Sequence, residues 1–163
     1  QHFSTYLIHT KKNFWFIDTR FFTVSILNVG STGSFIPSPS DAVYSATKAY
    51  IMSFSNALYG EYRHTGIKIT LLCPGATETN FARKANIEQT LLFKFAVMKP
   101  EQVVKIAYPK IVRGKRLIIP GLYNKFLIFC SKIMPLDITN KLTMIMMNNY
   151  REEGDNILEK FKC

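Results

Sequence analysis

Three consecutive segments in the first half of the chain have the apolar patterns of buried secondary structure. Residues 23–30, TVSILNVG, form a β-branched apolar run that stops at a glycine, which predicts a buried strand. Residues 42–64 carry apolar side chains at three- and four-residue steps, interrupted only by Gly60, which predicts a long helix. Residues 67–72, IKITLL, predict a second buried strand. A strand, a helix and a strand in this order indicate a parallel β-α-β unit.

The second half of the chain has helical patterns broken by prolines. Pro100 begins the segment PEQVVKIAYPKIVRG, in which Pro109 predicts a kink or an early end near Tyr108, because proline costs a helix interior about 3 kcal/mol. GKRLIIPG, at 114–121, predicts a short third strand. The tail divides at Pro135 into two apolar helices. The first of these places four large apolar side chains on one side: Leu122, Phe126, Phe129 and Ile133.

Composition and charge narrow the class of protein. With 163 residues, 47% of them hydrophobic and 20% charged, the chain is long enough for one globular domain with a buried core. The formal charge of +10 suits phosphates, nucleic acid or an anionic surface. The basic residues are scattered, however, with no arginine-rich run or zinc-finger spacing. A solvated basic surface is therefore expected rather than a nucleic-acid site.

The cysteines and the apolar runs give further expectations. Cys73, Cys130 and Cys163 have no CxxC spacing and no histidine partners, which predicts a reducing, cytoplasmic location and no metal site. Cys73 ends an apolar run and is expected to be a buried small hydrophobe. No signal peptide is visible at the start of this sequence. No stretch reaches the roughly 18 continuous apolar residues that a membrane-spanning helix needs.

The segment DAVYSATKAY, at 41–50, places a tyrosine and a lysine where they can act together. Tyr44 and Lys48 are four residues apart, so on a helix they lie on the same face. An isolated phenol titrates near pH ~10, and an adjacent ammonium lowers the pKa of a phenol. Tyr44 is thus predicted to exchange a proton with a carbonyl or alcohol oxygen, and Lys48 to bind sugar hydroxyls. Taken alone, such a pair also occurs by chance on many helices.

Ser31 and the segment at 74–79 each follow the carboxyl end of a predicted strand. Ser31 follows the first strand and lies thirteen residues before Tyr44. The segment PGATET, at 74–79, follows the second strand. Ligands of open α/β sheets bind outside the carboxyl ends of the strands, so these groups are predicted to share one site with the tyrosine and the lysine.

Together these segments resemble the short-chain dehydrogenases/reductases. ILNVGSTGSFIPSPSDAVYSATKAYIMSFSNAL and GIKITLLCPGATET contain the family's Ser, Tyr-x-x-x-Lys and Pro-Gly-x-x-x-Thr motifs in the expected order and separation. The resemblance implies an α/β fold, a partial Rossmann-like (doubly wound) parallel sheet with a C-terminal helical extension. It divides the chain into an unmatched segment at 1–25, the catalytic half at 26–120 and the extension at 121–163.

The resemblance also implies roles for individual residues. Ser31 matches the serine that positions and polarises the substrate carbonyl, and Tyr44 matches the catalytic acid/base. Lys48 matches the lysine that lowers the pKa of the tyrosine and binds the nicotinamide ribose. The nicotinamide side of NADP or NAD is implied to contact, besides Tyr44 and Lys48, four residues after the second strand: Pro74, Gly75, Thr77 and Thr79.

The implied reaction is the reduction of a carbonyl or the oxidation of a secondary alcohol in a small-molecule substrate. In the family, the segment at 80–99 covers the substrate, and the long helix packs against its copy in a homo-oligomer. The chain contains 13 Phe and 6 Met, which favours an apolar substrate such as a lipid-like or steroid-like carbonyl.

The chain departs from the family before residue 26. The family's glycine-rich TGxxxGxG turn, which binds the cofactor pyrophosphate, has no counterpart here, because the first glycine in the sequence is Gly30. The strand ending at Val29 is therefore expected to have an unpaired edge, and the chain to bind a dinucleotide poorly. These features indicate the catalytic half of such an enzyme, either as a fragment or as a degenerate copy.

Two alternatives to an enzyme stay open at the level of sequence. One is a non-catalytic interaction module that pairs through the Tyr44–Lys48 helix. The other is peripheral attachment to a membrane through residues 121–147, where apolar side chains lie among lysines. Core packing and a lid over an apolar substrate are the favoured explanation of that segment.

Overall fold

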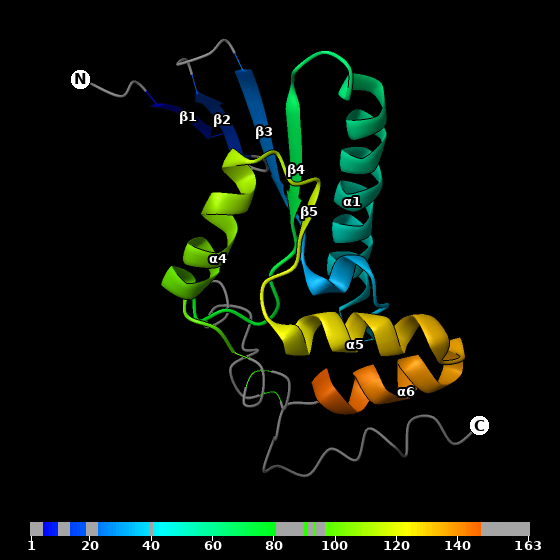
Figure 1. Cartoon of the computed structure of the whole chain (residues 1–163). Coiled ribbons are helices and arrows are strands. Elements are labelled where there is room, and N and C mark those ends of the chain that lie inside the picture. The colour runs from blue at the N-terminus through cyan, green and yellow to red at the C-terminus, as the bar shows by residue number, and fades with distance from the viewer. Residues whose placement is uncertain are drawn as a thin grey trace.

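The computed structural model of the protein describes residues 5–9, 14–18, 23–39, 41–80, 90, 93 and 97–147, with side chains from Val24 onward (Figure 1). The described strands are β1 Thr5–His9, β2 Phe14–Asp18, β3 Thr23–Val29, β4 Lys68–Leu72 and β5 Leu117–Ile118. The described helices are the 3-10 turn η2 Thr32–Ser34 and the α-helices α1 Ala42–Tyr62, α4 Pro100–Val112, α5 Leu122–Ile133 and α6 Leu136–Met147. The strand, helix and strand predicted between residues 23 and 72 are confirmed to within two residues.

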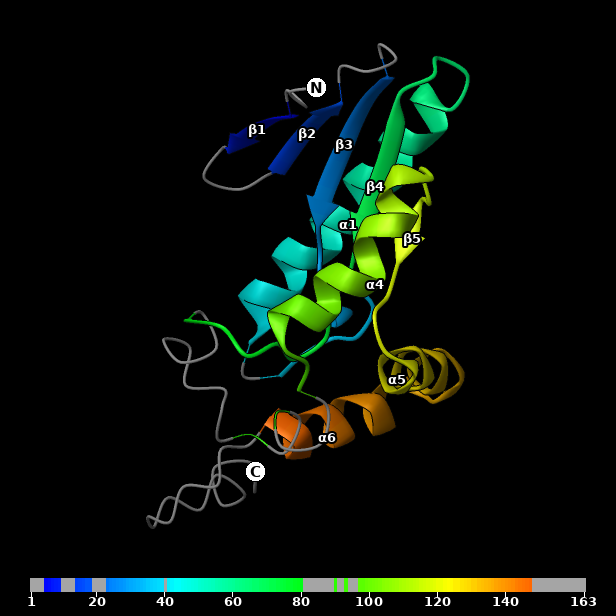
Figure 2. The same ribbon diagram turned by 60° about the vertical axis from the view of Figure 1, so that its left-hand side comes forward.

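The described strands form one mixed sheet in the order β1-β2-β3-β4-β5. Strands β3, β4 and β5 are parallel, with Ile26 opposite Ile69 and Leu72 opposite Ile118. Helix α1 connects β3 to β4 and α4 lies between β4 and β5 in the chain, and the two helices cover opposite faces of the sheet (Figures 1 and 2). The predicted parallel β-α-β unit, the short third strand and the α/β fold are thereby confirmed.

The two faces of the parallel strands pack in different ways, because side chains alternate along a strand. One face forms a buried apolar cluster with α4 and β5: Leu72, Val103, Ala107 and Ile118. On the α1 face, the Asn28 amide donates to the Ser55 hydroxyl (2.9 Å), which donates in turn to the Ile51 carbonyl (2.6 Å). Asn28 and Ser55 are buried, so this polar pair fixes the position of α1 along β3.

The edge of β3 is paired, contrary to the expectation from the sequence. Strand β2 pairs with it antiparallel, with Phe14 opposite Leu27 and Asp18 opposite Thr23, and β1 pairs antiparallel with β2. The run FWFI lacks a helical period, and its aromatic and β-branched residues are typical of a strand. Two strands from the segment at 1–25, which matched no part of the family, therefore extend the sheet. The strand direction reverses between β2 and β3.

Helix α4 continues through Pro109 to Val112, so the expected early end near Tyr108 is wrong. The reason lies in the packing of the helix against the sheet. Ala107 belongs to the buried cluster and Ile111 packs against that cluster from beyond the proline. Burial on both sides of Pro109 offsets the backbone hydrogen bond that the proline cannot make.

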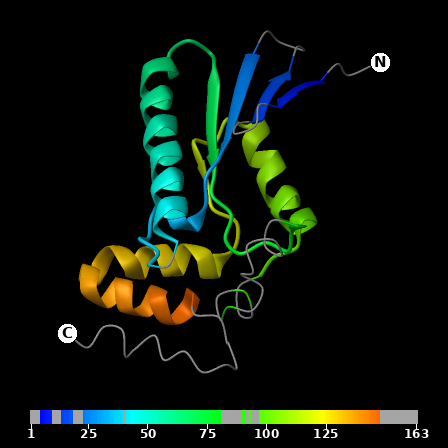
Figure 3. The same ribbon diagram turned by 180° about the vertical axis from the view of Figure 1, so that it is seen from behind.

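Helices α5 and α6 form a pair beyond the carboxyl ends of the parallel strands (Figures 1 and 3). They are separated at Pro135, as predicted. None of the helices that the structure describes is both long and apolar enough to cross a membrane. The pair therefore adds a layer at the edge of the sheet where the candidate chemistry was expected.

The loop after β4 makes a close contact with the start of α5. A Cβ on Gly75 would lie 2.6 Å from Cγ and Nδ2 of Asn124, and closer still to Oδ1. Asn124 is buried and donates through Nδ2 to the Pro120 carbonyl (2.7 Å), so its side chain cannot easily move. Glycine is therefore required where this loop meets α5.

Gly75→Ala is expected to lower the free energy of unfolding by about 1–3 kcal/mol, the usual cost of overpacking. The double variant Gly75→Ala/Asn124→Ala is expected to lose less than the two single variants summed, because the added methyl group fills the space of the amide. Urea unfolding followed by circular dichroism measures the difference.

Gly60→Ala is the matched control, because a Cβ at this position in α1 meets no atom within 4 Å. It should gain up to about 1 kcal/mol from the higher helix propensity of alanine. Equal stability of Gly75→Ala and the native chain would contradict the close contact with α5.

Candidate functional site

Backbone hydrogen bonds bring the segments after β3 and β4 together. The Gly30 amide donates to the Leu72 carbonyl (2.8 Å), and the Thr32 amide donates to the Pro74 carbonyl (2.9 Å). The turn that carries Ser31 therefore lies beside the loop that carries the Pro-Gly motif. This is the arrangement that the order of the strands predicted.

Ser31 is the N-cap of turn η2 and lies beside Tyr44. The Ser31 hydroxyl accepts from the Gly33 amide (3.2 Å), while the Ser34 hydroxyl accepts from the Ser31 amide (3.2 Å). These two bonds hold the Ser31 side chain in one place. A side-chain hydrogen bond joins Ser31 to Tyr44. The serine hydroxyl and the phenol thus meet at the end of β3.

Lys48 lies one helical turn beyond Tyr44 on α1. Its Nζ atom is 5.6 Å from the centroid of the Tyr44 ring and donates to the Val29 carbonyl (3.1 Å). Both side chains are half-buried. Ser31, Tyr44 and Lys48 are therefore neighbours in space, as the sequence predicted.

The predicted lowering of the Tyr44 pKa by Lys48 is wrong for this structure. Burial raises the pKa of Tyr44 above its usual 10.0, the hydrogen bond from Ser31 opposes this shift, and the negative charge of Asp41 adds to it. Burial also lowers the pKa of Lys48. Loss of hydration is thus the largest effect on the pKa of Tyr44, and the phenol stays protonated at neutral pH.

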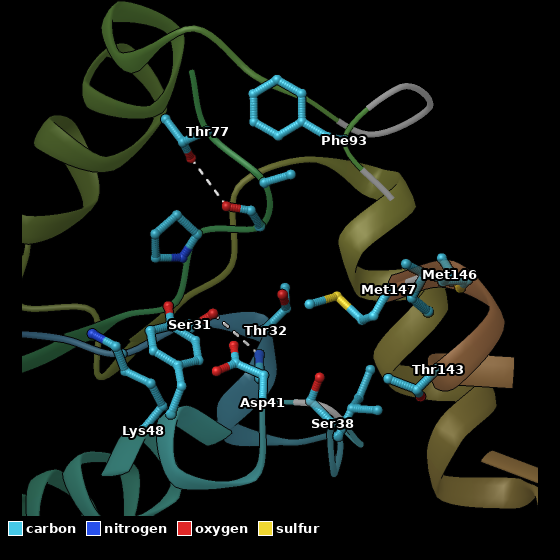
Figure 4. A pocket seen from close by; sticks show the side chains of 18 of the residues that line it. Ser31, Thr32, Ser38, Asp41, Lys48, Thr77, Phe93, Thr143, Met146 and Met147 are labelled. Carbon is cyan, nitrogen blue, oxygen red and sulfur yellow. Dashed lines mark hydrogen bonds between the residues drawn. The ribbon is translucent and has the colours of Figure 1, made fainter. Parts of the chain in front are cut away.

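Asp41 is an acidic residue of the site that the sequence did not predict. It is the N-cap residue of α1, but its side chain makes no capping hydrogen bond. The side chain instead lines the cavity described below (Figure 4). Burial raises the pKa of this carboxyl. Its negative charge disfavours the phenolate form of Tyr44, which lies one turn further along the helix.

Cys73 is buried behind the site, as predicted from the apolar run that it ends. Burial raises the pKa of the thiol to about 11, against the opposing effects of hydrogen bonds from Ser34 and Ser31 and of the Lys48 charge. A Cβ on Gly30 would lie 2.9 Å from the sulfur, so glycine is needed where β3 ends. A protonated, packed thiol fits a core residue and not a nucleophile.

The candidate residues line a single cavity of about 860 Å³. Ser31, Asp41 and Lys48 lie on one side of it, and Met146 and Met147 of α6 lie on the other (Figure 4). Further apolar side chains line the cavity from several elements: Ile36, Phe93, Val104, Leu127, Met134 and Leu142. The cavity therefore has a reactive polar wall and a broad apolar wall.

The loop after β4 lines the same cavity with all four residues implied to contact the nicotinamide: Pro74, Gly75, Thr77 and Thr79. The Thr77 hydroxyl donates to the Gly75 carbonyl (3.0 Å). The Met98 amide donates to the Ala76 carbonyl (3.0 Å), and the Glu78 amide donates to the Met98 carbonyl (3.0 Å). The loop is thus fixed on both sides of Thr77. Most of the predicted substrate cover at 80–99 lies outside the described residues.

Helices α5 and α6 contribute a wall that the sequence did not identify residue by residue. Cys130 and Ser131 of α5 and Thr139 and Thr143 of α6 all line the cavity. Thr139 and Thr143 are four residues apart on α6, and Cys130 and Ser131 follow the cavity residue Leu127 by three and four residues on α5, so each set shares one helix face. That signal was visible in the sequence, but periodicity alone does not say which face of a helix meets a cavity.

Comparison with known proteins matches the segment that carries these residues. A family model described as short chain dehydrogenase matches residues 22–90. The 17-beta-hydroxysteroid dehydrogenase type 3 of Mus musculus is 40% identical over 65 residues, which are 40% of this chain and 21% of that protein. The chain spans about a quarter of the length of the curated relatives it matches.

Solved structures agree with the sequence match. A short-chain dehydrogenase from Sphingobium yanoikuyae in complex with NADPH is 30% identical, with a TM-score of 0.55 over 62% of this chain and 39% of that chain. A 7beta-hydroxysteroid dehydrogenase is 26% identical, with a TM-score of 0.60 over 73% of this chain and 47% of that chain. The matched segment, which contains Ser31, Tyr44 and Lys48, is therefore similar to the short-chain dehydrogenases.

Proposed function

We propose that this chain carries the catalytic side of an NAD(P)-dependent oxidoreductase that interconverts a carbonyl and a secondary alcohol. The proposal is carried by the convergence of Ser31, Tyr44 and Lys48 on one cavity beside the loop 74–79. A phenol, a hydroxyl and an ammonium at one point supply a proton donor, a second hydrogen-bond donor and a positive charge. These are the groups that a substrate oxygen needs when its charge changes during a reaction.

In the reducing direction, Tyr44 donates its phenolic proton to the substrate carbonyl oxygen, and the Ser31 hydroxyl donates a hydrogen bond to the same oxygen. The Lys48 ammonium stabilises the phenolate that remains on Tyr44. A reduced nicotinamide, when bound, supplies the hydride that reaches the carbonyl carbon. Because burial raises the pKa of Tyr44, the phenol is protonated at neutral pH, which favours its action as an acid.

The residues of the cavity fit the nicotinamide side of such a cofactor. The loop 74–79 is fixed by its hydrogen bonds and lines the cavity next to Tyr44. Lys48 has donors suited to ribose hydroxyls, and Thr79 offers a polar side chain on the same loop. Among the described residues there is no glycine-rich turn for the pyrophosphate, so the contacts proposed here stop at the nicotinamide and its ribose.

An apolar ketone or alcohol is the substrate class that fits the cavity best. Its volume of about 860 Å³ lies in the usual range for small-molecule sites, and most of its wall is apolar. Two of the similar proteins are named as hydroxysteroid dehydrogenases. We extend this to the present chain as a proposal that its substrate is a steroid-like or lipid-like carbonyl.

The outer side of α1 supports a homo-oligomer. Val43 is 80% exposed and Tyr50 is 69% exposed on this helix, and Ala46, Ser53 and Ala57 beside them are exposed small residues. Small side chains allow two helices to approach closely, and apolar ones gain from the contact. Two copies of the chain are therefore proposed to pair through this side of α1.

A non-catalytic pairing module is the second candidate function, and the same exposed side of α1 favours it. The oxidoreductase must bind a nicotinamide cofactor, whereas the pairing module needs no cofactor. Titration of the chain with NADPH, followed by nicotinamide fluorescence, separates them, because a purely structural module has no reason to bind the cofactor.

Tyr44→Phe is expected to reduce the rate of NADPH-dependent ketone reduction about 100-fold to 10,000-fold, because the proton donor is lost while the ring remains. The assay follows NADPH absorbance with a panel of apolar ketones. Tyr62→Phe is the matched control at the far end of the same helix, since that side chain is exposed, and it should retain the native rate. Full activity in Tyr44→Phe would show that the role of Tyr44 is assigned wrongly.

The rate of ketone reduction is expected to stay level through neutral pH and to fall only in strongly alkaline solution, because burial holds the pKa of Tyr44 above that of a free phenol. Asp41→Asn removes a negative charge that raises the pKa of Tyr44, so the alkaline fall should move to lower pH. Glu61→Gln, an exposed change at the far end of α1, should leave the profile unchanged. A fall that moves to higher pH in Asp41→Asn would contradict the electrostatic coupling.

Ala46→Arg/Ala57→Arg is expected to convert a dimer into a monomer in sedimentation equilibrium, because two bulky charges would separate the paired helices. Tyr108→Arg, at an exposed position on α4, is the control and should leave the mass unchanged. A native chain that sediments as a monomer at all concentrations would remove the proposed pairing.

A further inference from the structure

Helix α5 has two faces with different environments. Asn124 and Ile128 are buried, and Leu127, Cys130 and Ser131 line the cavity. The opposite side carries four large apolar residues that are 60% to 83% exposed, here called the α5 outer stripe: Leu122, Phe126, Phe129 and Ile133. Their spacing of three and four residues places them along one line of the helix. The favoured explanation from the sequence therefore fits Ile128, which is buried, and Leu127, which lines the cavity, but not these four side chains.

Lysines flank the α5 outer stripe. Lys125 and Lys132 are seven residues apart, so they lie on one side of the helix, next to the stripe. Both are exposed. Helix α5 contains no acidic residue, so its exposed surface combines apolar side chains with positive charge only. The chain as a whole has a formal charge of +10.

Helix α6 repeats this combination beside α5 (Figures 1 and 3). Three of its apolar side chains are 48% to 61% exposed: Leu136, Ile138 and Ile145. Lys141 is exposed on the same helix, with Asp137 as its one acidic residue. The helix pair thus exposes many large apolar side chains at the end of the molecule, and monomeric proteins rarely leave such an apolar surface without a binding partner.

We infer that the α5 outer stripe docks onto the surface of a bilayer that contains anionic lipids. A helix with a broad apolar face bordered by lysines lies in the plane of a membrane surface, where the apolar side chains enter the acyl boundary and the lysines reach the headgroups. Protein interfaces fit less well, because they are depleted of lysine. The exposed apolar side chains lie along one side of α5, so the contact is with the membrane surface.

Docking in this way goes beyond the proposed reaction and does not depend on it. It would place the outer side of α5 in the lipid and its inner side, with Leu127, on the cavity. An apolar substrate dissolved in the membrane would then have a short path to the cavity.

Co-sedimentation of the whole chain with lipid vesicles tests the inference. The native chain is expected to bind vesicles of phosphatidylcholine mixed with phosphatidylserine, and to bind pure phosphatidylcholine more weakly. Phe126→Ser/Phe129→Ser should lower the partition coefficient about tenfold or more, because two aromatic side chains no longer enter the lipid. Lys125→Gln/Lys132→Gln should remove most of the preference for anionic vesicles and most of the dependence on salt.

Tyr108→Ser/Val112→Ser is the matched control, since it removes two exposed apolar side chains from α4 and should leave vesicle binding unchanged. Circular dichroism spectra and melting curves check that each variant is folded, which is expected because the substituted side chains are exposed. The inference is overturned if the native chain does not bind anionic vesicles, or if Phe126→Ser/Phe129→Ser binds them as the native chain does. A native dimer that this double variant dissociates would show that a second copy covers the stripe, and would overturn it as well.

Discussion

The site depends on one constraint, the close approach of the backbones where β3 and β4 end. Two amide-to-carbonyl bonds join the segments beyond these strands, and the approach is possible only because residue 30 is a glycine next to the sulfur of Cys73. This contact sets the Ser31 turn beside the Pro-Gly loop. The first turn of α1 then brings Tyr44 to the same point. A shift of either segment would separate the serine from the phenol.

Around Tyr44, burial and the negative charge of Asp41 both raise the pKa of the phenol, and only the hydrogen bond from Ser31 opposes them. The same loss of hydration affects the ammonium of Lys48, which is held by a backbone carbonyl at the end of β3. A site of low polarity makes each remaining interaction stronger than it would be in water. In the proposed reaction, donors held in this way would need little reorganisation around the substrate oxygen, which is the usual source of electrostatic catalysis.

The parallel β-α-β unit and the residues that line the site could be predicted from the sequence. Apolar periodicity marks the strands and the helix, and ligands of open α/β sheets bind at the carboxyl ends of the strands. The direction of the Tyr44 pKa could not, since it depends on how many atoms from distant segments cover the phenol. The pairing of β2 was missed because FWFI is short and no recognised turn precedes β3. The cavity-lining side of α5 was missed because the sequence shows which side chains share a helix face but not what that face packs against.

The antiparallel pairing of β2 changes what the sheet can offer a long ligand. Beside the carboxyl end of β3 lies the amino end of a strand, with Phe14 opposite Leu27. Crevices between neighbouring carboxyl ends exist only where strands run in the same direction, so in the described sheet they occur from β3 to β5 and not beyond. The edge of the sheet that the proposed cofactor would use therefore ends at β3, where the strand direction reverses.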